Sequence, residues 1–115
     1  MSNALMLIYT VPMSHATDVA QACFEAGAGE IGGYRQCCWS VVGQGQFKPT
    51  THAKPVLGEC NALTILDEMR VEMVCLKHNW PEIERALLIA HPYETPAYAA
   101  IEMINSLPEP TEGAQ

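Results

Sequence analysis

Two kinds of hydrophobic periodicity alternate along this chain, and their order constrains its fold more than any other feature. Apolar runs typical of strands occupy residues 5–11, 34–46, 66–77 and 97–104. Apolar residues at helical spacing occupy residues 15–26 and 79–90. The order is therefore strand, helix, strand, strand, helix, strand. It predicts a ferredoxin-like α+β sandwich, in which two helices cover one face of a four-stranded antiparallel sheet.

Capping and helix-breaking residues mark the ends of the predicted helices. Ser14 can cap the first helix, and Gly27 can adopt the left-handed conformation that ends it. Pro81 is tolerated in the first turn of the second helix, which stops before Pro92. Residues 47–61 contain two prolines and a glycine, which predict a loop long enough to carry function.

Length and composition favour a single domain. A chain of 115 residues with 49% apolar content supports one core, which we assign to residues 5–105. Residues 1–4 are interpreted as a leader of the kind that a cloning tag leaves, and residues 106–115 as a disordered, Pro-rich and acidic tail. The apolar run at residues 5–9 is too short to span a membrane and lacks the flanks of a secretory signal, so we expect a cytoplasmic protein.

Charge and cysteine content exclude several classes of partner and of fold. The chain has 13 acidic against 6 basic residues and a formal net charge of -7, which argues against nucleic acid and anionic membranes as partners. Five cysteines, an odd number, do not form a disulfide framework, so reduced thiols are expected. We expect the adjacent Cys37 and Cys38 to point to opposite faces of the second strand and to be buried by packing.

Gly27, Gly29 and Gly32 spell G-x-G-x-x-G, the pattern of a dinucleotide-binding turn. In such a site the glycines follow a strand and open a helix, whose N-terminus faces the pyrophosphate. Here they follow the first predicted helix and open a strand, so a phosphate would meet the negative end of the helix dipole. We therefore interpret them as a helix cap and a tight turn.

One face of the predicted sheet has no helix to cover it. Cys37, Trp39 and Val41 on the second strand indicate that part of this face is apolar. An apolar sheet face needs a cover, and a second copy of the chain is a natural one. The sequence therefore predicts a homo-oligomer.

Five short motifs occur along the chain in a characteristic order and spacing. They are GAG-x-IG-x-Y (27–34) followed by Cys37, GQGQFKP (43–49), AKPVLG (53–58), EMRVEM (68–73) and HPYETPAY (91–98). Together they resemble the small YqfO-type domain of the Nif-three-like family in a stand-alone form, over residues 6–104. The resemblance implies a fold similar to the CutA and PII-like proteins and a trimeric assembly.

In that family the YqfO-type domain is usually an insertion in a larger protein that carries a dinuclear metal site. The ligands of that site lie in flanking His-rich and Asp-containing motifs, which are absent from this sequence. The metal chemistry and the cyclohydrolase label of larger relatives therefore do not carry over. The positions that match the family are Gly27, Gly29, Gly32, Tyr34, Cys37, Gly43, Gly45, Phe47, Pro49, Pro55, Gly58, Glu68, Arg70, Glu72, His91, Pro92, Tyr93 and Glu94.

The densest polar cluster follows the second helix and comprises His91, Tyr93 and Glu94. A histidine beside a carboxylate can bind a metal ion or transfer a proton. One interpretation is structural: His91 caps the last helical carbonyls and Tyr93 packs. The other is functional: the cluster binds a small ligand, or His91 and Glu94 bind a divalent metal, in a site shared between subunits.

Glu68, Arg70 and Glu72 lie two positions apart on a predicted strand and therefore project from one face. An arginine between two carboxylates favours a structural ion-pair ladder, and acid-base chemistry is the alternative. We include all three among the candidate ligand-binding residues.

The chain has no G-x-S-x-G, H-E-x-x-H or C-x-x-C motif, so no catalytic constellation can be recognised. We predict a non-enzymatic, trimeric binding or regulatory module that holds a small molecule or a divalent cation between subunits. Two alternatives stay open. One is a small metal-dependent hydrolase that combines His91, Glu94, Glu68 and Glu72 from neighbouring subunits, and the other is a purely structural assembly module.

Overall fold

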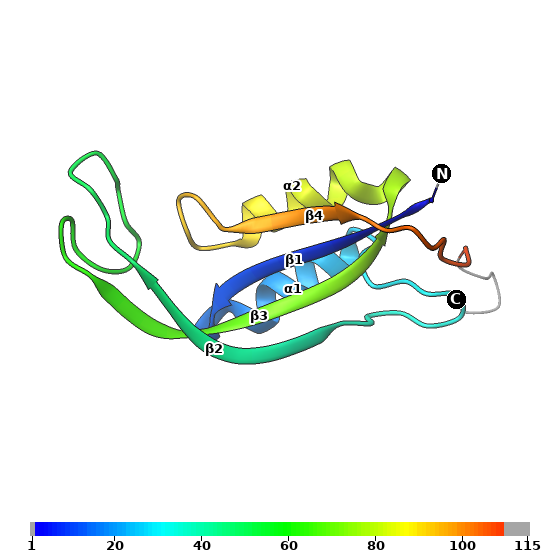
Figure 1. Ribbon diagram of the computed structural model, residues 1–115, viewed down its shortest axis with the longest axis horizontal. Helices are drawn as coiled ribbons and strands as arrows, with labels where there is room; N and C mark the ends of the chain where they lie inside the picture. Colours follow the sequence, from blue (N-terminus) through cyan, green and yellow to red (C-terminus); the bar gives the residue numbers. More distant parts are fainter. Residues whose placement is uncertain (1, 110–115) are drawn as a thin grey trace.

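The computed structural model describes residues 2–109, and residues 1 and 110–115 lie outside this description (Figure 1). The described elements follow the predicted order. Their bounds are β1 (Ala4–Pro12), α1 (Ala16–Glu25), β2 (Trp39–Phe47), β3 (Thr64–Leu76), α2 (Trp80–Ala90) and β4 (Tyr98–Glu102), and the 3-10 turns η1 (Met13–His15) and η2 (Lys77–Asn79) precede the helices. None of the helices in residues 2–109 is long and apolar enough to cross a membrane.

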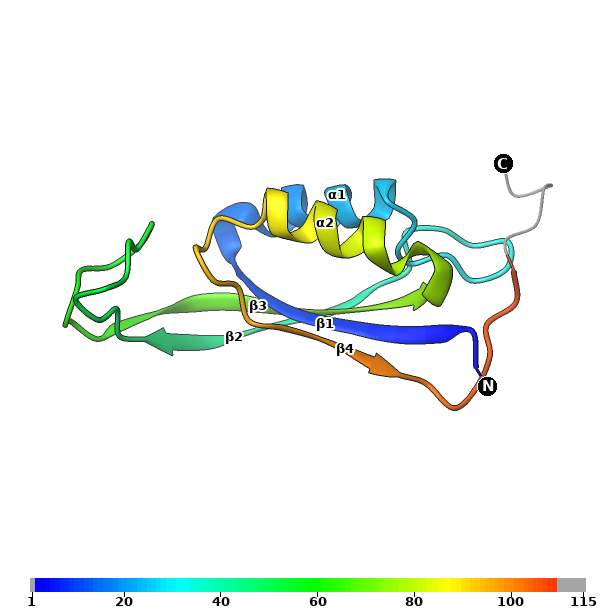
Figure 2. The same ribbon diagram turned by 90° about the horizontal axis from the view of Figure 1, so that it is seen from above.

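The four strands form one antiparallel sheet in the order β2-β3-β1-β4. Both helices lie on one face of this sheet (Figure 2), which confirms the ferredoxin-like α+β fold. Only residues 68–76 of β3 pair with β1, whereas residues 64–72 pair with β2. The β2–β3 hairpin therefore extends beyond the rest of the sheet, to the left in Figure 1.

Alternating side chains of the central strands form the core beneath the helices. Residues i and i+2 of a strand face the same side, and Leu7, Tyr9 and Val11 of β1 are at most 1% exposed. The helices contribute positions four residues apart, which are Val19 and Cys23 of α1 and Ile83 and Leu87 of α2. Burying an aliphatic side chain contributes roughly 1.5–3 kcal/mol, so these contacts hold both helices on this face.

The opposite side of the sheet is not covered by a helix within residues 2–109, and we call it the open face (Figure 2). The strand register places on it Met6, Ile8, Thr10, Trp39, Val41, Arg70, Glu72, Val74, Ala99 and Ile101. Trp39 is 58% exposed and Ile101 52% exposed. Part of this face is therefore apolar, as the sequence predicts.

The start of the first helix differs from the prediction. Ser14 does not cap α1 through its side chain, and its hydroxyl is instead hydrogen bonded to His15 Nδ1 at 2.8 Å. The turn η1 runs directly into the helix, so that the Ala16 N–H donates to the Met13 carbonyl without a side-chain cap. At the other end Gly27 has a φ of +110°, in agreement with its predicted role.

The glycine-rich segment after α1 is a turn held by backbone hydrogen bonds. The Gly29 N–H donates to the Val74 carbonyl at 2.8 Å, and the Gly29 carbonyl accepts from the Cys37 N–H at 3.0 Å. A side chain on Gly29 would meet the Cys37 carbonyl at 2.7 Å, and the φ of +78° also favours glycine. This turn delays the second strand, which begins at Trp39 and not at the predicted Tyr34.

Two of the cysteine predictions require correction. Cys37 and Cys38 both precede β2, and Cys38 is exposed, so the interpretation that both are buried strand residues is wrong. The buried thiols are those of Cys23 and Cys75, and burial raises the pKa of each to about 12. All five cysteines lie within residues 2–109 and none is in a disulfide.

The two described ends of the chain meet, which differs from the expected leader and tail. Leu107 is 8% exposed and packs with Ala4, the first residue of β1. The Asn3 side chain accepts from the Leu107 N–H at 2.9 Å and donates to its carbonyl at 3.0 Å. Residues 3–4 and 107 are therefore part of the fold, whereas the predicted disorder of residues 110–115 falls outside the described residues.

Candidate functional site

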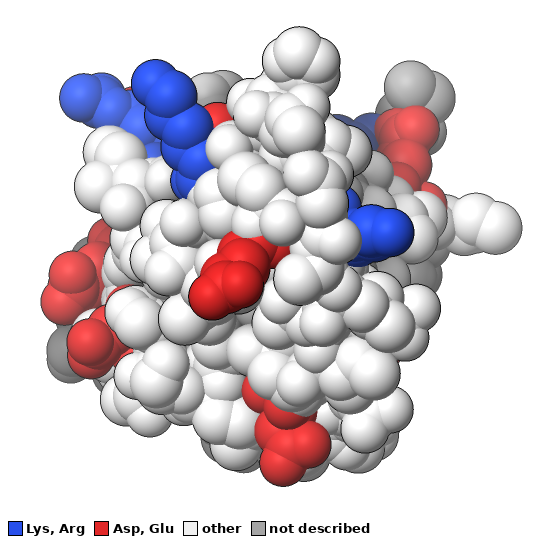
Figure 3. All heavy atoms as spheres, turned by 90° about the vertical axis from the view of Figure 1, so that its left-hand side faces the viewer, with Lys and Arg blue, Asp and Glu red and all other residues white. Residues whose placement is uncertain are grey.

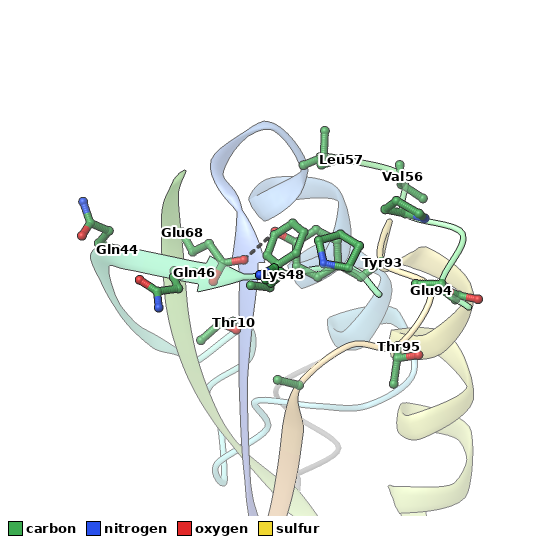
Figure 4. Close-up of a pocket in the computed structure, with 16 residues that line it drawn as sticks. Thr10, Gln44, Gln46, Lys48, Val56, Leu57, Glu68, Tyr93, Glu94 and Thr95 are labelled. Carbon is green, nitrogen blue, oxygen red and sulfur yellow. Dashed lines mark hydrogen bonds between the residues drawn. The ribbon is translucent and has the colours of Figure 1, made fainter. Parts of the chain in front are cut away.

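A pocket of about 530 Å³ lies where the sheet continues into the hairpin (Figure 4). Its walls come from the end of β2, the following loop, and residues 93–97 between α2 and β4. Thr10 of β1 and Glu68 of β3 also line it. Figure 3 looks onto this end of the molecule, where uncharged atoms make up most of the surface and charged side chains are scattered.

Glu68 is an almost buried carboxylate at this pocket, with 8% of its surface exposed. It leans across Gly45 of the neighbouring strand, and a Cβ on that glycine would overlap the Glu68 carboxylate. Gly43, which pairs directly with Glu68, has open space where a Cβ would stand. Because it has no side chain, Gly45 leaves the space that the Glu68 carboxylate occupies, as expected where another group approaches a strand closely.

Tyr93 holds the carboxylate from the other side. Its hydroxyl donates to Glu68 Oε2 at 2.5 Å. Burial, the hydrogen bond to Glu68 and the charge of that carboxylate raise the pKa of Tyr93 well above its ordinary value. The Phe47 ring meets the Tyr93 ring edge-on with centroids 5.6 Å apart. Tyr93 is thus a fixed donor that orients Glu68.

His91 lies behind Tyr93 and is 5% exposed. Its Nδ1 accepts from the Tyr93 N–H at 3.1 Å, and its Nε2 lies 2.7 Å from the Thr10 carbonyl. Because a carbonyl can only accept, Nε2 carries the proton of the neutral ring. Burial lowers the pKa of His91, partly offset by the Thr10 carbonyl and the charge of Glu68. The ring thus ties β1 to the loop. The backbone N–H of His91 donates to the Leu87 carbonyl at 2.9 Å, so His91 also caps α2, as the structural interpretation predicts.

The remaining predicted residues are distributed over two places. Glu94 Oε1 accepts from the Lys54 N–H at 3.0 Å and so links the two loops that form the pocket. Arg70 and Glu72 form an exposed ion pair of 3.2 Å on the open face. Of the six candidate residues, the structure brings Glu68, Tyr93 and Glu94 together around the pocket, places His91 behind it and leaves Arg70 and Glu72 outside.

Sequence reasoning assigned no site role to Thr10, Gly45, Phe47 or Lys48, which also line the pocket. The two glycines within the second strand were the available signal, because glycine in a strand marks a close approach. Among residues 2–109, no group of three or more His, Cys, Asp and Glu side chains is arranged to hold a metal ion. A metal bound by His91 would have to break one of its two hydrogen bonds, so the His91 and Glu94 metal site stays a prediction.

Comparison with known proteins places the chain in a family, although no family model matches it. The "GTP cyclohydrolase 1 type 2 homolog" of Mycobacterium leprae is 44% identical over 94 residues, which cover 82% of this chain and 24% of that protein. The crystal structure of a Bacillus cereus protein related to NIF3 superposes with a TM-score of 0.76 and 32% identity, over 90% of this chain and 26% of that one. The chain belongs to the NIF3-like family.

This NIF3-like chain spans about a quarter of the length of the curated relatives that it matches. The protein of the same name from Bacillus subtilis is 41% identical over 88 residues, 76% of this chain and 24% of that protein. The CutA1 protein of Shewanella sp. SIB1 has a TM-score of 0.63 at 21% identity, over 90% of this chain and 84% of its own. The likeness to CutA1 is therefore one of fold.

Proposed function

We propose that this NIF3-like domain is a binding module that holds a small molecule in the pocket around Glu68 and Tyr93. The observation that carries the proposal is a cavity of about 530 Å³ with a buried carboxylate held in one orientation. Sites for small molecules have volumes of about 300–1,000 Å³ and combine apolar walls with a few fixed polar groups. Phe47, Val56 and Leu57 supply such walls here.

The chemistry of the site supports binding over catalysis. A tyrosine with a raised pKa stays a phenol near neutral pH and is a poor base. Both nitrogens of the nearby His91 are engaged by the backbone, so the ring does not reach into the pocket as a proton acceptor. His91 and Tyr93 therefore fix the position of the Glu68 carboxylate, and a fixed polar group suits ligand recognition.

The open face supports assembly into a homo-oligomer as part of the same proposal. Trp39, Val41 and Ile101 are each at least 45% exposed there. A trimer is the assembly that the family resemblance implies. A purely structural assembly module remains the alternative that this exposed apolar face favours.

The test is a screen of chemically diverse fragments by protein-observed NMR. Binders of the pocket are expected to shift the amide signals of Gly45, Phe47 and Tyr93, and to leave those of Thr17 and Asp18 on α1, which line no pocket described here, unchanged. A folded protein whose pocket amides respond to no fragment would contradict the proposal and favour the assembly module. Native mass spectrometry of protein purified without chelators would report subunit number and any bound molecule or metal together.

A further inference from the structure

We propose that the pocket selects small organic cations and that Glu68 supplies the opposite charge. This inference rests on the proposed binding function and adds the chemical class of the ligand. Three observations lead to it: the lack of a cationic partner for Glu68 among residues 2–109, the second carboxylate oxygen, which accepts no hydrogen bond there, and the apolar walls around it.

Glu68 has no cationic partner among the residues that the structure describes. The ion pairs found there are Arg70–Glu72, Lys77–Glu102 and His78–Glu109. The donor to Oε2 is the neutral hydroxyl of Tyr93. A nearly buried carboxylate without a positive partner is costly, so a ligand that supplies the charge gains affinity from this site.

The second carboxylate oxygen is available to such a ligand. Within residues 2–109, Glu68 Oε1 accepts no hydrogen bond; it lies against the backbone of Gly45 but is not fully buried. Both Gly45 and Glu68 line the pocket, and Figure 4 shows the Glu68 carboxylate hydrogen bonded to Tyr93 at its wall. A ligand N–H can therefore donate to Oε1 while Tyr93 keeps Oε2, and such charge-assisted hydrogen bonds are strong.

The walls favour an organic cation over a metal ion. Phe47, Pro55 and Leu57 line the cavity with apolar atoms, and the rings of Phe47 and Tyr93 can contact a cation through their π-systems. A hard metal ion needs about six oxygen ligands, whereas Glu68 offers one free oxygen. Lys48 also lines the pocket, but among the described residues it forms no ion pair with Glu68.

Benzamidine and benzamide provide the test, because they share a shape and differ in charge. Titration of the full chain with each probe, followed by the amide signals of Gly45 and Phe47, gives the two affinities. We expect benzamidine to bind about tenfold more tightly or better, the range of a charge-assisted hydrogen bond. In Glu68→Gln, whose amide oxygen can still accept from Tyr93, this preference should disappear.

Glu72→Gln is the matched control, since it removes a carboxylate from the same strand outside the pocket, and it should keep the preference. Equal binding of both probes in the pocket, or a preference that persists in Glu68→Gln, would overturn the cation inference while the binding function stands. If neither probe nor any fragment shifts these signals, the proposed function falls and the inference with it.

Discussion

Glu68 is positioned by two residues that carry no charge, Gly45 on one side and Tyr93 on the other. The sequence places Tyr93 beside His91 and Glu94, and this cluster was predicted from adjacency alone. Tyr93 and Glu68 are 25 positions apart, and their contact depends on strand register and on the path of a loop. Local patterns do not encode either, which is why the pair itself was not predicted.

We predict that Gly45→Ala lowers the free energy of unfolding by about 1–3 kcal/mol, because the added methyl group displaces the Glu68 carboxylate from Tyr93. Gly43→Ala on the same strand is the control, since a Cβ there meets nothing within 4 Å. Denaturant unfolding would measure both. Equal stabilities of the two variants would show that the carboxylate is not confined by Gly45.

The stability of the fold should depend on pH through the buried side chain of His91. Because the pKa of His91 is lowered in the folded state, the unfolded chain binds a proton near pH 6.5 that the folded chain does not. The His91 contribution to stability is therefore present above about pH 6.5 and is lost as the pH falls through the lowered folded pKa. The free energy of unfolding, measured from pH 7.5 to 5, should decrease with acidification.

In His91→Gln this pH dependence should become smaller, whatever the variant's stability at pH 7. His78→Gln provides the comparison, because the His78 side chain is 64% exposed. A wild-type slope that both variants reproduce would exclude His91 as its source.

At the scale of elements, the periodicities placed each helix and strand within a few residues of its observed bounds. The exception is the segment before β2, where β-prone residues such as Tyr34 suggested a strand. In the structure this segment forms a turn, in which the Gly29 N–H donates to the Val74 carbonyl and the Gly29 carbonyl accepts from the Cys37 N–H. The β propensity of this segment is therefore outweighed by the hydrogen bond between Gly29 and Val74 of β3, a contact that forms only in the folded chain.

The two loops around the pocket are joined by the hydrogen bond from the Lys54 N–H to Glu94. We predict that Glu94→Ala speeds hydrogen exchange at the Lys54 amide several-fold and changes global stability by less than about 0.5 kcal/mol, since the contact is exposed. Glu59→Ala, on the same loop, should leave that amide unchanged. Unaltered exchange in Glu94→Ala would mean that the loop is held by other contacts.

At the scale of the whole molecule, the proposed assembly depends on the open face. We predict that the wild-type chain is an oligomer and that Trp39→Glu converts it to a monomer, because a charge on this face cannot be buried without a partner. Ile89→Glu is the control, since Ile89 is 76% exposed on α2, on the helical side of the sheet. Sedimentation velocity would measure both. A monomeric wild-type protein would refute the assembly.

The hydrogen bonds between Asn3 and Leu107 join positions that are 104 residues apart. A polypeptide that entered at one of these residues and left at the other would gain a whole domain with almost no displacement between the two crossing points. Folding of the domain already brings these two positions together, so the host chain would not lose further entropy in closing a loop of this length. The two ends also lie opposite the hairpin in a molecule 51 Å long (Figure 1). A host protein carrying this segment in a surface loop could thus keep its own backbone geometry, and the Glu68 pocket would stand well clear of it.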